Sequence, residues 1–142
     1  MKWYYFLLIP FILISCANQN KSPKSGNTDS GLTKTGSGLK YIILKKGNGP
    51  PAKVGQEVLI YETTTYLNGT VLYSNENSTN PVKVLIGGNQ ATAGVDEGLR
   101  GMQVGEIRKL IVPPYLAKRK TYPENISPDS ALVIKIILHK IL

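Results

Sequence analysis

The chain has few of the side chains on which most catalytic chemistry depends. Its 142 residues include one cysteine, Cys16, and one histidine, His139. A single cysteine excludes an internal disulfide, and without a Cys/His cluster there is no zinc-type ligand set. No Ser/His/Asp set and no glycine-rich phosphate loop can be recognised either. We therefore expect neither a metal nor a cofactor, and we interpret His139 as a strand residue that faces solvent.

Acidic side chains are also scarce. The chain has 17 Lys and Arg against 9 Asp and Glu, for a net charge of +8. This balance can favour anionic partners such as lipid headgroups or nucleic acid. However, no Arg-rich helix or basic-aromatic stripe of the kind found in nucleic-acid modules is present. We interpret the excess as a solvated basic surface and expect no nucleic-acid partner; a protein that holds an anionic polymer is the weaker alternative.

The one long apolar run lies near the N-terminus. Residues 3–14 are almost entirely apolar and follow Lys2, a pattern that is too short for a comfortable membrane span and typical of a secretory signal. Leu13-Ile14-Ser15-Cys16 resembles a bacterial lipobox, in which the signal is cut before a cysteine that becomes lipidated. A plain signal or a membrane anchor is the alternative. This reading predicts a lipid-anchored protein of the bacterial envelope, and Ala17 after the cysteine favours the outer membrane over the inner one.

The next segment contains little apolar surface. Residues 17–37 are mostly Asn, Lys, Ser, Gly and Thr, without apolar periodicity, so they predict a flexible tether. The expected organisation is therefore a signal peptide over 1–15, a lipidated cysteine and linker over 16–37, and a folded domain over 38–142. We expect this domain to be a monomer.

Several segments of the domain have the composition of strands. They are β-branched, aromatic or alternating, and they are bounded by Gly, Pro and Asn. The expected strands are 39–46, 58–66, 71–74, 82–86, 107–112 and 132–142. Asn68-Gly69 is a strong hairpin signal. Residues 116–130 form a long loop, and such loops are often functional.

One stretch predicts a helix. Val95, Leu99 and Met102 recur at i, i+4 and i+7, which places them on one apolar stripe. Gly98 weakens this helix, and Gly101 can end it with a left-handed residue, so we expect about two turns. A helix this short is not stable alone. It must be held in the concave face of a sheet, which predicts an α+β fold with a twisted antiparallel sheet wrapped around one short helix.

The same stretch carries a resemblance to a known family. The run from Gly94 to Glu106, with Pro113-Pro114-Tyr115-Leu116-Ala117 after the next strand, resembles the FKBP family of peptidyl-prolyl cis-trans isomerases. Gly55-Gln56-Glu57, Asn68-Gly69, Pro81, Gly87 and Ala131 to Ile134 fall in register with it, over residues 38–142. The resemblance implies an FKBP-like fold and an enzyme that assists folding of proline-containing polypeptides. Such an enzyme needs no nucleophile: a dry pocket favours the twisted X-Pro amide over the planar one.

The resemblance also implies a substrate pocket. Carried over by position, its residues are Glu62, Leu72, Tyr73, Val82, Ala91, Thr92, Val95, Lys118, Ile126 and Ile134. The family has aromatic side chains at most of these positions, and only Ile126 is identical here.

The implied roles leave two readings of the pocket. The Thr92 backbone N–H would bind the substrate carbonyl, and Tyr122 could enter from the long loop. Lys118, Arg119 and Lys120 put positive charge at the mouth, which could select acidic partners or belong to a solvated loop. The side chains that line this pocket are smaller than those of the family, so two alternatives remain. The protein is either a weak isomerase or a catalytically inactive module that docks a protein partner.

Overall fold

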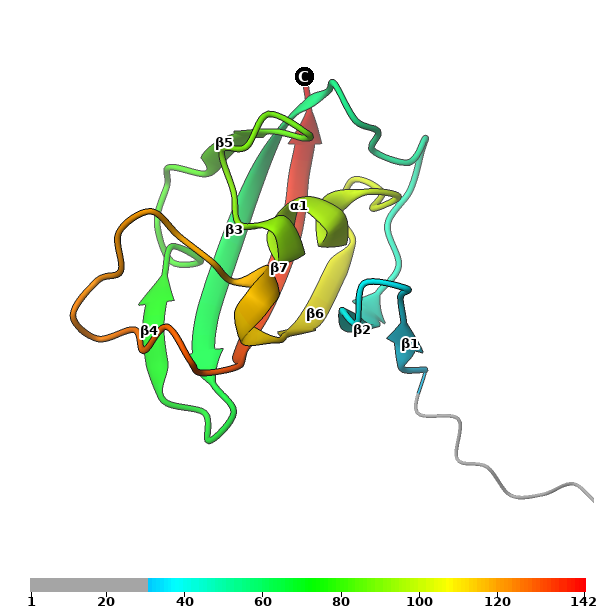
Figure 1. The fold of residues 1–142 in the computed structure, drawn as a ribbon. Helices are drawn as coiled ribbons and strands as arrows, with labels where there is room; N and C mark the ends of the chain where they lie inside the picture. The colour runs from blue at the N-terminus through cyan, green and yellow to red at the C-terminus, as the bar shows by residue number, and fades with distance from the viewer. Residues whose placement is uncertain (1–30) are drawn as a thin grey trace, which may run out of the picture.

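The computed structural model describes residues 31–142, and Figure 1 shows a curved sheet with one short helix against its concave face. Its elements in chain order are β1 (Thr33–Lys34), β2 (Lys40–Lys45), β3 (Glu57–Tyr66), β4 (Val71–Ser74), β5 (Val82–Leu85), α1 (Ala93–Leu99), β6 (Ile107–Val112), the 3₁₀ helix η1 (Pro114–Leu116) and β7 (Leu132–Ile141). Within 31–142, no helix is long and apolar enough to cross a membrane. The predicted signal peptide and Cys16 lie outside the described residues.

The seven strands form one antiparallel sheet. Its order is β1-β2-β6-β7-β3-β4, and β5 also pairs with β3. The final strand, β7, therefore lies in the middle of the sheet between β6 and β3. Every second residue of β7 points into the core, because strand side chains alternate between faces; these are Leu132, Ile134, Ile136 and Leu138, each 1% exposed or less. The predicted α+β fold is confirmed.

Helix α1 packs on the concave face of the sheet through Val95 and Leu99, whereas Met102, the third residue of the expected stripe, lies beyond the end of the helix. Leu99 and Met102 are fully buried and Val95 is 5% exposed. Gly98 also has a structural role that the helical pattern does not reveal. A Cβ there would lie 2.5 Å from Leu110 Cδ1, so glycine lets the helix approach β6 closely. Gly101 has φ +78°, the expected left-handed residue after the helix.

The hairpin between β3 and β4 forms at the predicted place. The Gly69 N–H donates to the Tyr66 carbonyl at 3.0 Å, and Gly69 has φ +90°. Asn68 has no positive φ; its side chain instead accepts a 3.0 Å hydrogen bond from the Thr70 N–H. A bulge between Thr64 and Thr65 follows in the pairing of the two strands.

The last residues of the predicted linker contact the folded domain. Thr33 and Lys34 pair with β2 as strand β1. Ser37 Oγ donates to Glu97 Oε2 at 2.7 Å, and Tyr115 Oη donates to the Ser37 carbonyl at 2.8 Å. This segment is held by backbone pairing and by two polar contacts. Because it buries no row of apolar side chains, its sequence lacks the apolar periodicity that predicts a strand.

Candidate active site

A cavity of about 580 Å³ opens between β3, β5, the start of α1 and the loop that follows η1. It is lined by Ile60, Glu62, Thr64, Val82, Val84, Asn89, Gln90, Ala91, Thr92, Val95, Lys118, Arg119, Lys120, Thr121 and Ile134.

The cavity has an aliphatic floor. Ile60 and Ile134 are 1% exposed, Val84 is 4% exposed and Val95 is 5% exposed, and they come from β3, β7, β5 and α1 respectively. Val82 lies nearer solvent, at 37% exposure. These side chains offer a dry surface to a group as apolar as a proline ring, but they provide no aromatic face.

The start of α1 forms one wall. Thr92 is the N-cap residue, with extended backbone (φ −63°, ψ 154°), and its side chain does not cap the helix. The Thr92 Oγ1 atom is buried without a hydrogen-bond partner in the part of the chain that the structure describes. The first N–H groups of a helix have no partner within the helix. This wall can therefore supply hydrogen bonds to a peptide carbonyl.

Glu62 brings a carboxylate into the apolar row of β3. It lies between Ile60 and Thr64 on the inward face and pairs with Ile136 of β7. Its backbone N–H donates to Asn75 Oδ1 at 2.7 Å, which holds the strand in place beside the cavity. Burial raises the pKa of the Glu62 carboxyl above 4.5, and the positive charge of Arg119 opposes that shift in part.

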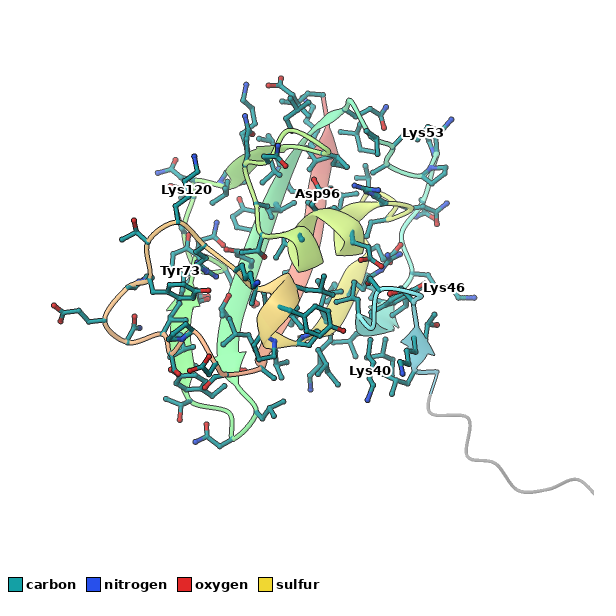
Figure 2. The ribbon with its side chains drawn as sticks, in the orientation of Figure 1. Lys40, Lys46, Lys53, Tyr73, Asp96 and Lys120 are labelled. Atoms are coloured by element: carbon teal, nitrogen blue, oxygen red, sulfur yellow. The ribbon has the colours of Figure 1, made fainter. Side chains whose placement is uncertain are left out.

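The loop after η1 forms a basic mouth. Lys118 and Lys120 are exposed and Arg119 is half-buried. The Arg119 backbone N–H donates to Tyr122 Oη at 3.3 Å, whereas Arg119 Nε is buried and has no hydrogen-bond partner among residues 31–142. Figure 2 shows Lys120 on the outer side of this loop, on the opposite side of the molecule from Lys40 and Lys46.

The structure brings together seven of the ten predicted pocket residues: Glu62, Val82, Ala91, Thr92, Val95, Lys118 and Ile134.

The other three predicted residues, Leu72, Tyr73 and Ile126, are not among the residues that line this cavity. Ile126 is 6% exposed and belongs to the core under the long loop, and Leu72 packs against that core. Tyr73 is 43% exposed on β4, where it pairs with Thr64. Tyr122 lines a neighbouring groove that shares Lys118 and Arg119 with the cavity.

Other lining residues were not predicted. Thr64 is buried opposite Ile134, and the alternation of β3 could have revealed it. Asn89 and Gln90 come from the loop before α1, where Asn89 has φ +55° and Gln90 Oε1 accepts a 2.8 Å hydrogen bond from the Leu85 N–H. No sequence pattern identifies them.

Comparison with known proteins defines the class. The family model for FKBP-type peptidyl-prolyl cis-trans isomerases matches residues 49–139, and the chain therefore belongs to this family. FK506-binding protein 1 of Dictyostelium discoideum is 36% identical over 97 residues, which cover 68% of this chain and 91% of that protein. Peptidyl-prolyl cis-trans isomerase FKBP10 of Mus musculus is 33% identical over 87 residues, 61% of this chain, but the match spans only 15% of that relative.

Solved structures agree on the fold. FkpA from Escherichia coli superposes with a TM-score of 0.70 at 26% identity, over 80% of this chain and 53% of that one. A peptidyl-prolyl cis-trans isomerase from Pseudomonas syringae superposes with a TM-score of 0.68 at 21% identity, over 80% of this chain and 83% of that one.

Proposed function

We propose that this chain is a peptidyl-prolyl cis-trans isomerase that assists the folding of proline-containing polypeptides. The observation that carries the proposal is the aliphatic floor beside the wall formed by Thr92, within a domain of this family. Rotation about an X-Pro bond is slow because the amide has partial double-bond character, with a barrier of about 18–20 kcal/mol. The twisted amide has lost resonance and charge separation, so a dry floor destabilises it less than the planar amide. That difference lowers the barrier.

The altered walls make this a slow isomerase in our proposal. Aliphatic side chains bury less substrate surface than aromatic rings would. The Glu62 carboxyl also holds water near the rotating bond, and water stabilises the planar amide.

The test measures isomerisation of a proline peptide by NMR exchange. We expect weak acceleration by the wild-type chain and at least tenfold more by Val95→Trp with Lys118→Tyr, which requires about 1.4 kcal/mol of extra transition-state binding. No acceleration by either protein would defeat the proposal, and vigorous turnover by the wild type would defeat its claim of weakness.

A binding module without catalysis is the second candidate. The observation that favours it is the polar part of the cavity lining, where Glu62 lies beside the aliphatic floor and Arg119 lies at the mouth. In that case a proline peptide would perturb the Thr92 and Ile134 resonances in a titration, yet its isomerisation rate would not change.

We further propose that lipid on Cys16 anchors the protein in the bacterial envelope, which is supported by the Leu13-Ile14-Ser15-Cys16 pattern. Cys16→Ala should abolish lipid labelling and leave the signal uncut. Ser15→Ala keeps a small residue before the cysteine and is the matched control, which should still be labelled. Unchanged labelling of the Cys16→Ala protein would exclude the anchor.

The membrane can be tested separately. We propose the outer membrane, since Ala17 occupies the position at which many bacteria place Asp to retain lipoproteins in the inner membrane. Ala17→Asp should then move the protein to the inner-membrane fraction, and a wild-type protein already found there would contradict this.

A further inference from the structure

The mouth of the cavity holds three consecutive cationic side chains. Lys118, Arg119 and Lys120 all line it. Within residues 31–142 none of the three forms a salt bridge, although four other basic side chains do. Four carboxylates of the described residues are paired with those other cations, and none of the described carboxylates forms a close ion pair with the charge at the mouth.

Arg119 is the most constrained of these cations. Its backbone is tied to Tyr122 Oη, and its Nε atom is buried without an acceptor among the described residues. A buried guanidinium N–H without a partner is unfavourable. A carboxylate that enters the cavity would supply the missing acceptor, and Arg binds carboxylates with paired, charge-assisted hydrogen bonds.

The charge of the cavity lining favours such a carboxylate. Glu62 is the only acidic residue among the lining residues, against three cations. It lies in the apolar row of β3, whereas Lys118 and Lys120 are exposed at the rim. An acidic side chain at the rim would therefore meet positive charge first.

Lys118 and Arg119 also line a second groove, together with Tyr115, Tyr122 and one acidic residue, Asp129. Lys118 and Arg119 thus lie between the two hollows. A polypeptide whose proline occupies the first cavity and whose chain continues into the second groove would pass directly over them.

From this arrangement we infer that the site selects polypeptides with Asp or Glu beside the proline. The inference rests on the proposed function, in which proline-containing polypeptides enter this cavity. The proline ring lies on the floor of Ile60, Val84 and Val95, and the neighbouring carboxylate contacts Arg119 and the lysines. The net charge of +8 adds long-range attraction for acidic chains.

The experiment uses three peptides that differ only in the residue before proline, which is Glu, Gln or Lys. Binding is measured by NMR titration of the full chain and kcat/KM by NMR exchange. We expect the Glu peptide to be preferred over the Gln peptide by about fivefold at low salt, the factor that one favourable ion pair supplies. The preference should shrink in about 1 M salt, where the screening length falls to about 3 Å. The Lys peptide should be the poorest.

Variants locate the origin of the preference. Arg119→Gln should bring the Glu/Gln ratio close to one, and Lys120→Gln should lower it less. Glu62→Gln should raise it, because a repelling carboxylate is removed. Lys46→Gln is the matched control: it removes one positive charge at an exposed position far from the cavity and should leave the ratio unchanged (Figure 2). If circular dichroism shows that Arg119→Gln is unfolded, Lys118→Gln with Lys120→Gln replaces it, because both side chains are exposed.

The outcomes separate this inference from the proposed function. Turnover of all peptides without a preference for Glu would overturn the inference and leave the isomerase standing. A Glu preference in binding without turnover would support the inference and defeat the isomerase. An equal fall of the ratio in Lys46→Gln and Arg119→Gln would overturn the inference, because it would trace the preference to net charge.

Discussion

The two ends of helix α1 rest on the same sheet but differ in how their polar groups are satisfied. At the C-terminal end, the buried charged side chains Glu106 and Arg108 form hydrogen bonds and a salt bridge. At the N-terminal end, Thr92 Oγ1 and Arg119 Nε are buried without partners among residues 31–142.

Arg108 is the centre of the satisfied end. It is 5% exposed, and its Nε donates to Glu106 Oε1 at 2.8 Å. One of its terminal nitrogens donates to the carbonyls of Gly98 and Arg100, at 3.0 and 3.2 Å. Its guanidinium carbon also lies 4.5 Å from the centre of the Tyr41 ring, a cation–π contact. Arg108 thus provides donors and positive charge where the helix carbonyls end.

The difference between the two ends indicates their roles. A polar network whose members are all satisfied fixes one arrangement of the chain and has no capacity left for a ligand. A buried polar atom without a partner needs an explanation, and a missing ligand is one of them. We therefore interpret the Arg108 end as structural and the Thr92 end as the binding end.

The largest effect is expected when the hydrogen bonds of Arg108, at the C-terminal end of α1, are removed. Arg108→Met leaves Glu106 buried without its counter-charge, and we expect a loss of about 3–5 kcal/mol in the free energy of unfolding, measured with urea. Lys109→Met, an exposed neighbour, is the control and should change little. Adding Glu106→Leu to Arg108→Met should recover part of the loss, because no buried charge then remains unpaired. A loss below about 1 kcal/mol in Arg108→Met would contradict a structural role.

A second test addresses the packing that both ends share. Leu99 lies on the buried stripe of α1, and Leu99→Ala should lower the free energy of unfolding by about 2–5 kcal/mol. Val71 is 62% exposed on β4, so Val71→Ala is the matched control, with an expected change within about 0.5 kcal/mol. Equal effects of the two substitutions would mean that the helix stripe does not carry the core.

A third test uses pH to examine the carboxylate at the binding end. Burial, opposed in part by Arg119, raises the pKa of Glu62, so the folded state holds this proton at pH values where the unfolded state releases it. The stability of the wild type should therefore fall as pH rises from about 4.5 through the folded pKa. Glu62→Gln lacks this fall, so its stability relative to the wild type should increase across that window, as urea unfolding would show. A difference that is constant with pH would contradict the burial of the charge.

The smallest effect is expected at Glu76, which follows β4 and contacts Thr63 of β3 and Lys135 of β7. Burial acts to raise the pKa of Glu76, but hydrogen bonds from Lys135 and Thr63 and the charge of Lys135 outweigh it, and the pKa is lowered. Its contribution is present above the unfolded pKa and disappears as pH falls through the folded pKa, a pH dependence opposite in sign to that of Glu62. Because the Glu76 and Lys135 side chains are 22% and 39% exposed, Glu76→Gln should cost only about 0.2–1 kcal/mol at neutral pH. A larger effect, or one insensitive to salt, would show that this pair is not a surface pair.

The regular elements were predictable because their side chains repeat. The alternation in β7 and the spacing of Val95 and Leu99 on α1 each mark one face, and the structure buries those faces. Met102 is also buried, but it lies beyond the end of the helix. Strand β1 was missed because hydrogen bonds of the backbone leave no trace in residue type. The role of Arg108 was also missed, although its alternation with Leu110 and Val112 places it on the inward face of β6.

The sequence predicted the residues of the candidate site only where they lie on strands or at the start of the helix. Glu62 and Ile134 lie on strands and Thr92 is the N-cap residue of α1, and all three positions transfer from the family pattern. Leu72 and Tyr73 do not transfer in this way, because they adjoin the bulge in the pairing of β3 with β4. Ile126 does not transfer because its loop folds it into the core, and loop paths depend on contacts that residue type alone does not reveal.

The central place of β7 has a consequence for how the chain acquires its shape. β2 and β6 lie on one side of β7, and β3 lies on the other. Residues 132–141 are synthesised after the other strands of this sheet, so until then the two halves of the sheet have no strand to join them. Native pairing must await a late segment that binds partners far away in sequence, and such non-local closure is slow. The sheet therefore remains unclosed until β7 has been synthesised. The cavity, which needs both β3 and β7 for its floor, is completed only then.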